Sequence, residues 1–282
     1  MKSDLLCIGH VCHDQIKEGQ FALGGTVSYA SLLAKSLGCS PHVLTSYGPD
    51  FQFAHVFAEQ QIGLSCKPSD HTTLFKNEYS GSERKQTIYR RAETLESFDL
   101  SDQLRTIPLV MFGTIADEVD HRLVYELRDT FSGASIQGWL RTWDEDGIVH
   151  PKEMHWEMLR EINVVLMSAE DIRGFEQMIP TIAEIVEIVV ITNGERDAEI
   201  YQGGKKYKFP VFPIQEVDPT GAGDTFAITF LVEYYRNQDL FHAAVMAHCA
   251  ASLVVEEKGV CRSIPMDKLR NRYDEYLKIS PL

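Results

Sequence analysis

The sequence predicts an α/β fold: a doubly wound, mostly parallel sheet with a small β lid. Short apolar runs alternate with segments of helical periodicity, as in βαβ units, and one pair of β-rich runs breaks that order. The expected strands of the main sheet are residues 5–11, 42–46, 109–113, 164–167 and 188–192. The expected helices are residues 27–37, 118–129, 223–236 and 240–255.

The composition fits one large globular domain, which we take to span residues 1–282. Of its residues, 44% are hydrophobic, enough for a sizeable core, so the disordered and low-complexity classes are excluded. The 41 acidic and 27 basic side chains give a net charge of −14. Because this charge repels phosphate backbones and anionic lipid, we expect neither nucleic acid nor a membrane as a partner.

The sequence also favours a cytoplasmic location. The N-terminus leads directly into the first strand, without the basic and apolar regions of a secretory signal. The longest apolar stretch, residues 240–255, contains His242 and His248 and is shorter than the roughly 18 residues of a membrane span. The six cysteines form no CxxC pair, which favours reduced, packed thiols.

One region interrupts the alternation and predicts the lid. Residues 72–79 and 85–91 are β-rich and are separated by the turn-forming residues 80–84, a pattern typical of a hairpin. We place this lid at about residues 66–98; the alternative is an edge hairpin packed on the sheet. An exposed face of the lid would allow two copies to pair as a homodimer. Two later hairpins, 142–149 and 198–209, are interpreted as structural.

Residues 217–226, Val-Asp-Pro-Thr-Gly-Ala-Gly-Asp-Thr-Phe, carry the most specific chemical pattern in the chain. The two glycines allow successive backbone N–H groups to converge at a helix N-terminus, where the helix dipole favours an anion. Asp224 lies in the first helical turn beside them, where a carboxylate can accept a proton from an attacking hydroxyl. This spacing suits phosphoryl transfer; the alternative is a tight turn with Asp224 as a helix cap.

This run resembles the signature of the ribokinase-like, or PfkB, family of carbohydrate kinases, and the other elements follow that family's order over nearly the whole chain. The resemblance implies that Asp224 is the catalytic base and that the backbone of Gly221, Ala222 and Gly223 forms an anion hole. It also implies ATP as the phosphoryl donor and Mg²⁺ as its counterion. A P-loop kinase is excluded, because the Gly-x-x-x-x-Gly-Lys-Ser/Thr motif is absent from the sequence.

For the acceptor, the resemblance implies a site made by Asp14, Gly24 and Gly25, in which the carboxylate binds hydroxyls and the glycines allow close backbone approach. A turn-capping role is the alternative for Asp14. Gln137 and Arg141, in Gln-Gly-x-x-Arg, resemble the myo-inositol kinase branch more than ribokinase or adenosine kinase. They would donate hydrogen bonds to ring hydroxyls, whereas the alternative for Arg141 is a surface residue that stabilises the 142–149 hairpin.

For the nucleotide, the resemblance implies a site at the ends of later strands. Ser168 and Asp171 occupy the place of the family's Asn-x-x-Glu, which is linked to magnesium through water and phosphate. Thr192 and Gly194 lie in the turn near the nucleotide; for Ser168 and Thr192 ordinary capping is the alternative. Asp218 and Thr220 stand where ribokinases hold a monovalent cation such as K⁺.

These features together predict an ATP-dependent kinase that phosphorylates a hydroxyl of a small polyol, with myo-inositol or a related cyclitol as the first choice. A sugar or nucleoside kinase of the same family is one alternative. A non-catalytic protein that keeps the fold and binds such a ligand is the other.

Overall fold

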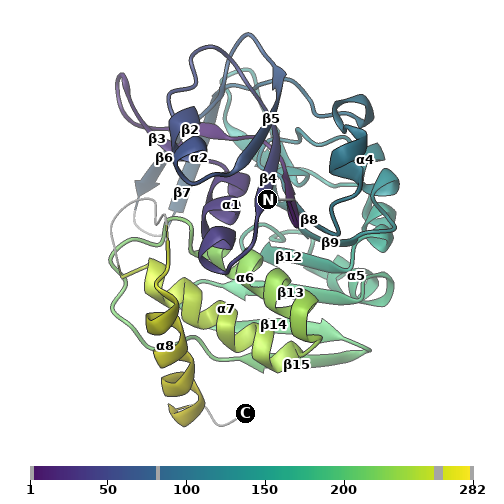
Figure 1. The fold of residues 1–282 in the computed structure, drawn as a ribbon, viewed down its shortest axis with the longest axis vertical. Coiled ribbons are helices and arrows are strands. Elements are labelled where there is room, and N and C mark those ends of the chain that lie inside the picture. Colours follow the sequence, from purple (N-terminus) through teal and green to yellow (C-terminus); the bar gives the residue numbers. More distant parts are fainter. Residues whose placement is uncertain (1–2, 81–82, 257–262, 280–282) are drawn as a thin grey trace.

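A computed structural model of the chain describes residues 3–80, 83–256 and 263–279, and it confirms the predicted α/β fold with a doubly wound sheet (Figure 1). Within these residues the main sheet has nine strands in the order β15-β14-β13-β12-β9-β8-β1-β4-β5. In this order across the sheet, neighbouring strands from β13 to β5 pair in parallel, whereas β14 and β15 extend the sheet with antiparallel pairing. They span β1 (Leu5–Ile8), β4 (Pro41–Tyr47), β5 (Gly63–Pro68), β8 (Leu109–Gly113), β9 (Phe131–Ser135), β12 (Val164–Ser168), β13 (Ile188–Asn193), β14 (Arg196–Gln202) and β15 (Lys205–Phe209).

Helices cover both faces of this sheet because successive strand residues point to opposite sides. Leu5 and Cys7 of β1 belong to one buried cluster, and Leu6 and Ile8 belong to the other. The first face carries α1 (Thr26–Ser36), α2 (Ala54–Glu59), α6 (Ala222–Asn237), α7 (Leu240–Val254) and α8 (Met266–Ile279). The second face carries α3 (Asp102–Arg105), α4 (Arg122–Glu126) and α5 (Ile179–Ile185).

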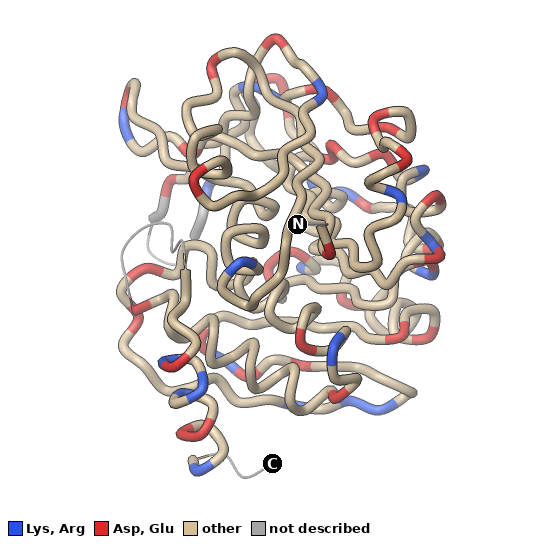
Figure 2. Tube along the Cα trace, viewed as in Figure 1, with Lys and Arg blue, Asp and Glu red and all other residues tan. Residues whose placement is uncertain are grey.

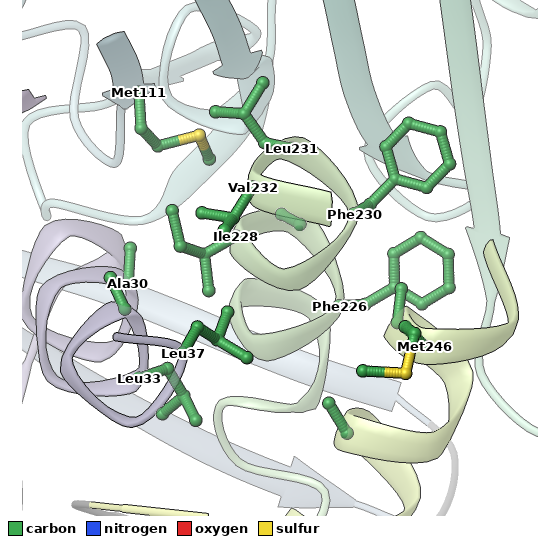
Figure 3. Packing of buried hydrophobic residues seen from close by; sticks show 14 of the residues in the cluster. Ala30, Leu33, Leu37, Met111, Phe226, Ile228, Phe230, Leu231, Val232 and Met246 are labelled. Atoms are coloured by element: carbon green, nitrogen blue, oxygen red, sulfur yellow. The ribbon is translucent and has the colours of Figure 1, made fainter. Parts of the chain in front are cut away.

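The packing of α6 on α1 and on the sheet fixes the positions of two helix N-termini. Ala30 and Leu33 of α1 lie beside Ile228 of α6 (Figure 3). On β9, a Cβ at Gly133 would lie 2.7 Å from a methyl carbon of Leu231, so glycine lets α6 approach the strand closely. Since these contacts are buried and apolar, they hold α1 and α6 in place against each other and against the sheet.

A second sheet contains the hairpin predicted as a lid and has four strands, β3-β2-β6-β7. The predicted hairpin is confirmed as β6 (Thr73–Ser80) and β7 (Glu83–Arg90), which pair antiparallel. The predicted range of 66–98 needs correction, because residues 66–68 belong to β5 and two lid strands lie far upstream. These are β2 (Cys12–Lys17) and β3 (Gln20–Gly24), whose short sequences carry little apolar alternation. The tip of the predicted turn, residues 81–82, lies outside the described residues.

Two other predictions are wrong in their extent, and a buried carboxylate bonds to loops in both regions. The expected strand 5–11 ends at Ile8, and the expected helix 118–129 forms only as α4. Glu118 is fully buried and accepts hydrogen bonds from the backbone amides of His10, Ile115 and Ala116 at 2.7 to 3.1 Å. These bonds hold both loops in non-helical, non-sheet conformations, since the carboxylate competes with regular backbone pairing.

Both later hairpins form as predicted. The first is β10 (Arg141–Trp143) with β11 (Val149–Pro151), and the second is β14 with β15. The first hairpin also contacts the lid, because the Ile88 amide of β7 donates to the Gly147 carbonyl at 2.8 Å.

The surface and the thiols agree with the composition. Figure 2 shows Lys and Arg spread over the molecule among the acidic residues, which outnumber them 41 to 27 in the sequence. Across the described helices, none is both long and apolar enough to cross a bilayer. Five cysteines are free thiols, as predicted; the sixth, Cys261, is outside the described residues.

Candidate active site

The turn into α6 presents open backbone donors. Gly221 caps the helix with φ +80°, and a Cβ there would lie 2.7 Å from the Tyr29 ring, so only glycine fits. The Ala222 amide donates to the Pro219 carbonyl at 3.1 Å and is thus used within the turn. The amides of Gly221, Gly223 and Asp224 make no hydrogen bond to a described residue. The open donors are therefore these three, rather than the predicted set that includes Ala222.

Asp224 lies in the first turn of α6, and the chain around it leaves this carboxyl partly shielded from water. Burial raises the pKa of Asp224 to about 6. The polar side chain of Thr26 and the charge of Arg141 act against this rise in the pKa, whereas the carboxylates of Asp171 and Asp14 add to it. A carboxyl with such a pKa is ionised at neutral pH and still takes up a proton readily, as a general base must.

Asp14 approaches the same point from the lid. It lies on β2 opposite Ala22 of β3, and a Cβ on Gly24 would overlap its carboxylate. Gly25 has φ +94° and caps α1, and a Cβ there would overlap the His10 carbonyl oxygen. The paired glycines therefore let α1 begin directly behind the Asp14 carboxylate.

Gln137 and Arg141 are bonded to each other and to the N-terminus of α1. Gln137 follows β9, and its Nε2 donates to Thr26 Oγ1 at 3.1 Å. Arg141 donates from Nη2 to Gln137 Oε1 at 2.6 Å and from Nη1 to the Ile115 carbonyl at 3.1 Å. Arg141 thus faces inward. An open pocket of about 220 Å³ lies beside them and is lined by Gln86, Gln137, Leu140, Arg141, Val149, His150, Pro151, Glu170, Asp171 and Arg173.

Ser168 and Asp171 cap each other at the end of β12. The Ser168 amide and hydroxyl both donate to Asp171 Oδ2, at 2.9 and 2.7 Å, and the Asp171 amide donates back to Ser168 Oγ at 3.0 Å. Thr192 is the parallel neighbour of Ser168 on β13, and Gly194 follows in the left-handed region with φ +58°. The structure therefore brings these four residues to adjacent strand ends, and it gives Ser168 the capping role that was its alternative.

The loop before α6 is held at both ends. Asp218 Oδ1 accepts the Thr220 amide at 3.0 Å, and the amides of Val217 and Asp218 donate to the Val255 carbonyl at 2.8 and 3.1 Å. Asp218 and Thr220 therefore share one turn, tied to the residue that caps the end of α7.

Sequence reasoning missed several residues at this site because their signals are tertiary. Thr26, 1% exposed, accepts a hydrogen bond from Gln137 and its side chain acts on the pKa of Asp224, and its position directly after the paired glycines was the available clue. Burial raises the pKa of the Tyr29 hydroxyl and of the Cys12 thiol, and the charges of Asp14 and Asp224 add to both shifts. Both side chains close the site with neutral groups.

The protein side chains at this site suit a magnesium ion that is coordinated mainly by substrate phosphates. Among residues 3–80, 83–256 and 263–279, no three His, Cys, Asp or Glu side chains are placed to hold a metal. Mg²⁺ usually keeps several waters and takes one or two carboxylates together with substrate phosphates. Asp171 suits this arrangement, because both bonds from Ser168 go to Oδ2 and neither to Oδ1.

Comparison with known proteins gives consistent matches. Residues 10–267 match the sequence profile described as pfkB family carbohydrate kinase. Inositol 3-kinase of Arabidopsis thaliana is 26% identical over 275 residues, which cover 90% of this chain and 74% of that protein. Nucleoside kinase of Methanocaldococcus jannaschii is 32% identical over 135 residues, covering 45% and 44%.

Solved structures share the fold at lower identity. A pyrophosphate-dependent kinase in the ribokinase family, complexed with a pyrophosphate analog and myo-inositol, aligns with a TM-score of 0.78 at 19% identity, covering 94% of this chain and 99% of the other. Arabidopsis thaliana ribokinase, complexed with ribose and ATP, aligns with a TM-score of 0.73 at 18% identity, covering 99% and 100%. The fold is therefore ribokinase-like, as the sequence predicted.

Proposed function

This chain belongs to the pfkB family of carbohydrate kinases, and from that premise we propose that it transfers a phosphoryl group from ATP to a hydroxyl of a small polyol. Myo-inositol or a related cyclitol is the proposed acceptor. One observation carries the proposal: a carboxyl with a pKa of about 6, Asp224, stands beside open amides at a helix N-terminus. The charges of Asp14 and Arg141 both act on this carboxyl. The residues proposed to bind the polyol therefore lie near the amides proposed to bind the transferring phosphate.

In the proposed reaction, the acceptor hydroxyl oxygen attacks the terminal phosphorus of ATP while Asp224 accepts the hydroxyl proton. The new oxygen–phosphorus bond forms as the bond to the ADP oxygen breaks, and ADP leaves with the electron pair. The open amides of Gly221, Gly223 and Asp224 would stabilise the negative charge on the transferring group, as an anion hole does. The lid would exclude water, which would otherwise compete as the acceptor.

The acceptor would be held by Asp14, Gln137 and Arg141. A carboxylate accepts hydrogen bonds from neighbouring hydroxyls, and the amide and guanidinium groups donate them. This mixture of acceptors and donors suits a ring that carries many hydroxyls. Gly24 and Gly25 would let the backbone approach the ring closely.

The nucleotide would bind across Ser168, Thr192 and Gly194, at the carboxyl ends of β12 and β13, where ligands bind in open parallel sheets. When bound with ATP, Mg²⁺ would neutralise phosphate charge, and Asp171 would hold it through water.

We further propose that Asp218 and Thr220 bind a monovalent cation, which predicts faster turnover in K⁺ than in a buffer without it. We also propose that two copies of the chain pair through the lid, where the apolar side chains of Ile16 and Tyr89 are 63% and 52% exposed. Light scattering tests this by measuring whether the molar mass in solution is that of one chain or of two.

The test is a screen of ATP consumption over cyclitols, pentoses, hexoses and nucleosides, repeated with pyrophosphate as the donor. The Asp224→Asn variant serves as the blank, because it removes the base and changes no more than one side-chain atom. Turnover with a cyclitol above the other classes supports the proposal, and preference for a sugar or nucleoside redirects it within the family. Absence of turnover with every acceptor, together with tight ligand binding, would favour a non-catalytic binding protein.

A further inference from the structure

The buried carboxylate of Glu118 joins its own loop, which follows β8, to the loop that leads from β1 to β2. The amides of His10 and Ile115 donate to Oε1 at 3.1 and 3.0 Å. The amides of Ile115 and Ala116 donate to Oε2 at 3.0 and 2.7 Å. Movement of either loop away from Glu118 would leave a buried carboxylate oxygen with fewer donors, which costs free energy.

The loop after β8 supports the segment that carries two of the side chains proposed to bind the polyol. The Gly138 amide donates to the Thr114 carbonyl at 3.2 Å, and a Cβ on Gly138 would overlap the Ile115 nitrogen. Arg141 donates from Nη1 to the Ile115 carbonyl at 3.1 Å. Ile115 therefore bonds to Glu118 through its amide and to Arg141 through its carbonyl.

The other loop leads into the smaller sheet, where β2 carries Asp14. A carbonyl oxygen only accepts, so Nε2 of His10 donates to the Glu93 carbonyl at 2.9 Å. Burial lowers the pKa of His10, which favours the neutral ring, so Nδ1 accepts from the Thr73 hydroxyl at 2.8 Å. Thr73 Oγ1 in turn accepts the Ala92 amide at 2.9 Å. His10 therefore ties the approach to β2 to the start of β6 and to the residues that follow β7.

We propose that Glu118 is a positioning residue that fixes Asp14 and Arg141 relative to each other. This inference rests on the proposed function, which assigns both side chains to the acceptor. Asp14 belongs to a strand entered through His10, and Arg141 is held by Ile115, so the two groups come from different elements that Glu118 joins. A polyol that bonds to both groups needs them at a fixed separation, because reaction geometry tolerates little displacement.

The Glu118→Gln variant tests this role because it keeps the shape of the side chain but replaces one oxygen by an NH₂ group that only donates. Since both oxygens of Glu118 face amide donors, either orientation of the glutamine places N–H groups against N–H groups. We expect the KM for myo-inositol to rise on the order of 10-fold, the loss that follows when a hydrogen bond to a charged group is weakened. The KM for ATP should stay that of the parent.

The matched control is Glu233→Gln. Glu233 is also a buried carboxylate, and near the end of α6 it accepts from Asn237 Nδ2 at 3.2 Å and contacts His242 Nε2 at 3.1 Å. A loss of stability alone reduces the amount of folded enzyme and leaves both KM values unchanged. Glu118→Gln should therefore raise the KM for myo-inositol and Glu233→Gln should not. An unchanged KM for myo-inositol in a Glu118→Gln enzyme that turns it over overturns the proposal.

A readout without turnover separates this inference from the proposed function. The backbone amide signals of Asp14 and Arg141 are compared by NMR in the parent, Glu118→Gln and Glu233→Gln. Shifts of both signals in Glu118→Gln but not in Glu233→Gln support the positioning role, even if myo-inositol is not phosphorylated. An unshifted signal at either position overturns it, even if the protein proves to be a cyclitol kinase. If Glu118→Gln does not fold, Glu118→Asp, which keeps the charge but withdraws both oxygens, takes its place with the same expected results.

Discussion

The two halves of the proposed active site are built from different chemical groups. In the acceptor half, polar side chains bond to one another, as Arg141 does to Gln137 and Gln137 does to Thr26. In the donor half, the amides of Gly221 and Gly223 make no bond to a described residue, and the side chains cap their own turns. The acceptor half comprises Asp14, Gly24, Gly25, Thr26, Gln137 and Arg141. The donor half comprises Ser168, Asp171, Thr192, Gly194 and residues 217–223.

This difference indicates where selectivity and affinity arise. A network of side chains has one geometry and rejects a ligand that leaves its polar groups unpaired. Backbone amides around glycines recognise any phosphoryl group, since they offer donors and space but no shape specific to one molecule. We therefore expect the acceptor half to select the alcohol and the donor half to bind the transferring phosphate. Single substitutions in each half test this division.

The strongest loss of activity is expected where the halves meet, at Asp224. Asp224→Asn should lower kcat on the order of 10²-fold or more, because the amide cannot accept the hydroxyl proton. Binding of ATP, measured by calorimetry, should be nearly unchanged, since the amides remain. The variant should also melt at a higher temperature, because burial disfavours the carboxylate and asparagine carries no charge. Turnover close to that of the parent would remove Asp224 from the mechanism.

Gly24→Ala should damage the acceptor half alone. The new methyl would overlap the Asp14 carboxylate and push it away, lowering kcat/KM for the acceptor on the order of 10²-fold with ATP binding intact. Combining Gly24→Ala with Asp14→Ala provides the control. If Gly24 acts through Asp14, the double variant should be no worse than Asp14→Ala; additive losses would contradict this explanation.

Gly223→Ala should separate function from stability in the donor half. No described atom lies within 4 Å of the added Cβ, and alanine is a better helix former by up to about 1 kcal/mol. The variant should therefore be at least as stable as the parent in urea. It should nevertheless lose kcat by about 10-fold or more, because the added methyl would hinder phosphate from reaching an amide, and one hole donor contributes about 10² to 10³. Unchanged kinetics with raised stability would show that no phosphate approaches this amide.

The sequence predicted the elements and residues whose signals are local. Buried strands of the main sheet and helices such as α1 and α6 show apolar patterns, and the 217–226 run identifies its own turn. Strands β2 and β3 were missed because CHDQIK and QFALG carry little apolar alternation; their pairing depends on the distant strand β6. Thr26 and Glu118 act through contacts with residues far along the chain, which no short pattern reports.

The pH profile should distinguish the side-chain base from the amide donors. With the pKa of Asp224 raised to about 6, kcat should fall roughly 10-fold per pH unit below that value, because only the carboxylate accepts a proton. The KM for ATP should change much less, since amides do not titrate there. The folded state binds this proton more tightly than the unfolded state, so this group makes stability rise as pH falls through about 6. If the kcat of Asp224→Asn still falls in the same way at low pH, the acid limb of the profile belongs to a group other than Asp224.

The weakest effect is expected at the Ser168 and Asp171 caps. Ser168→Ala removes the hydroxyl that donates to Asp171 at 2.7 Å and accepts the Asp171 amide at 3.0 Å. Loss of such a cap costs about 1 kcal/mol of the free energy of unfolding, measurable in urea. Ser132→Ala is the matched control, because the Ser132 hydroxyl is buried without a partner among the described residues. If Ser168→Ala also raises the KM for ATP while Ser132→Ala does not, the cap orients Asp171 toward the nucleotide; a loss of stability alone restricts Ser168 to capping.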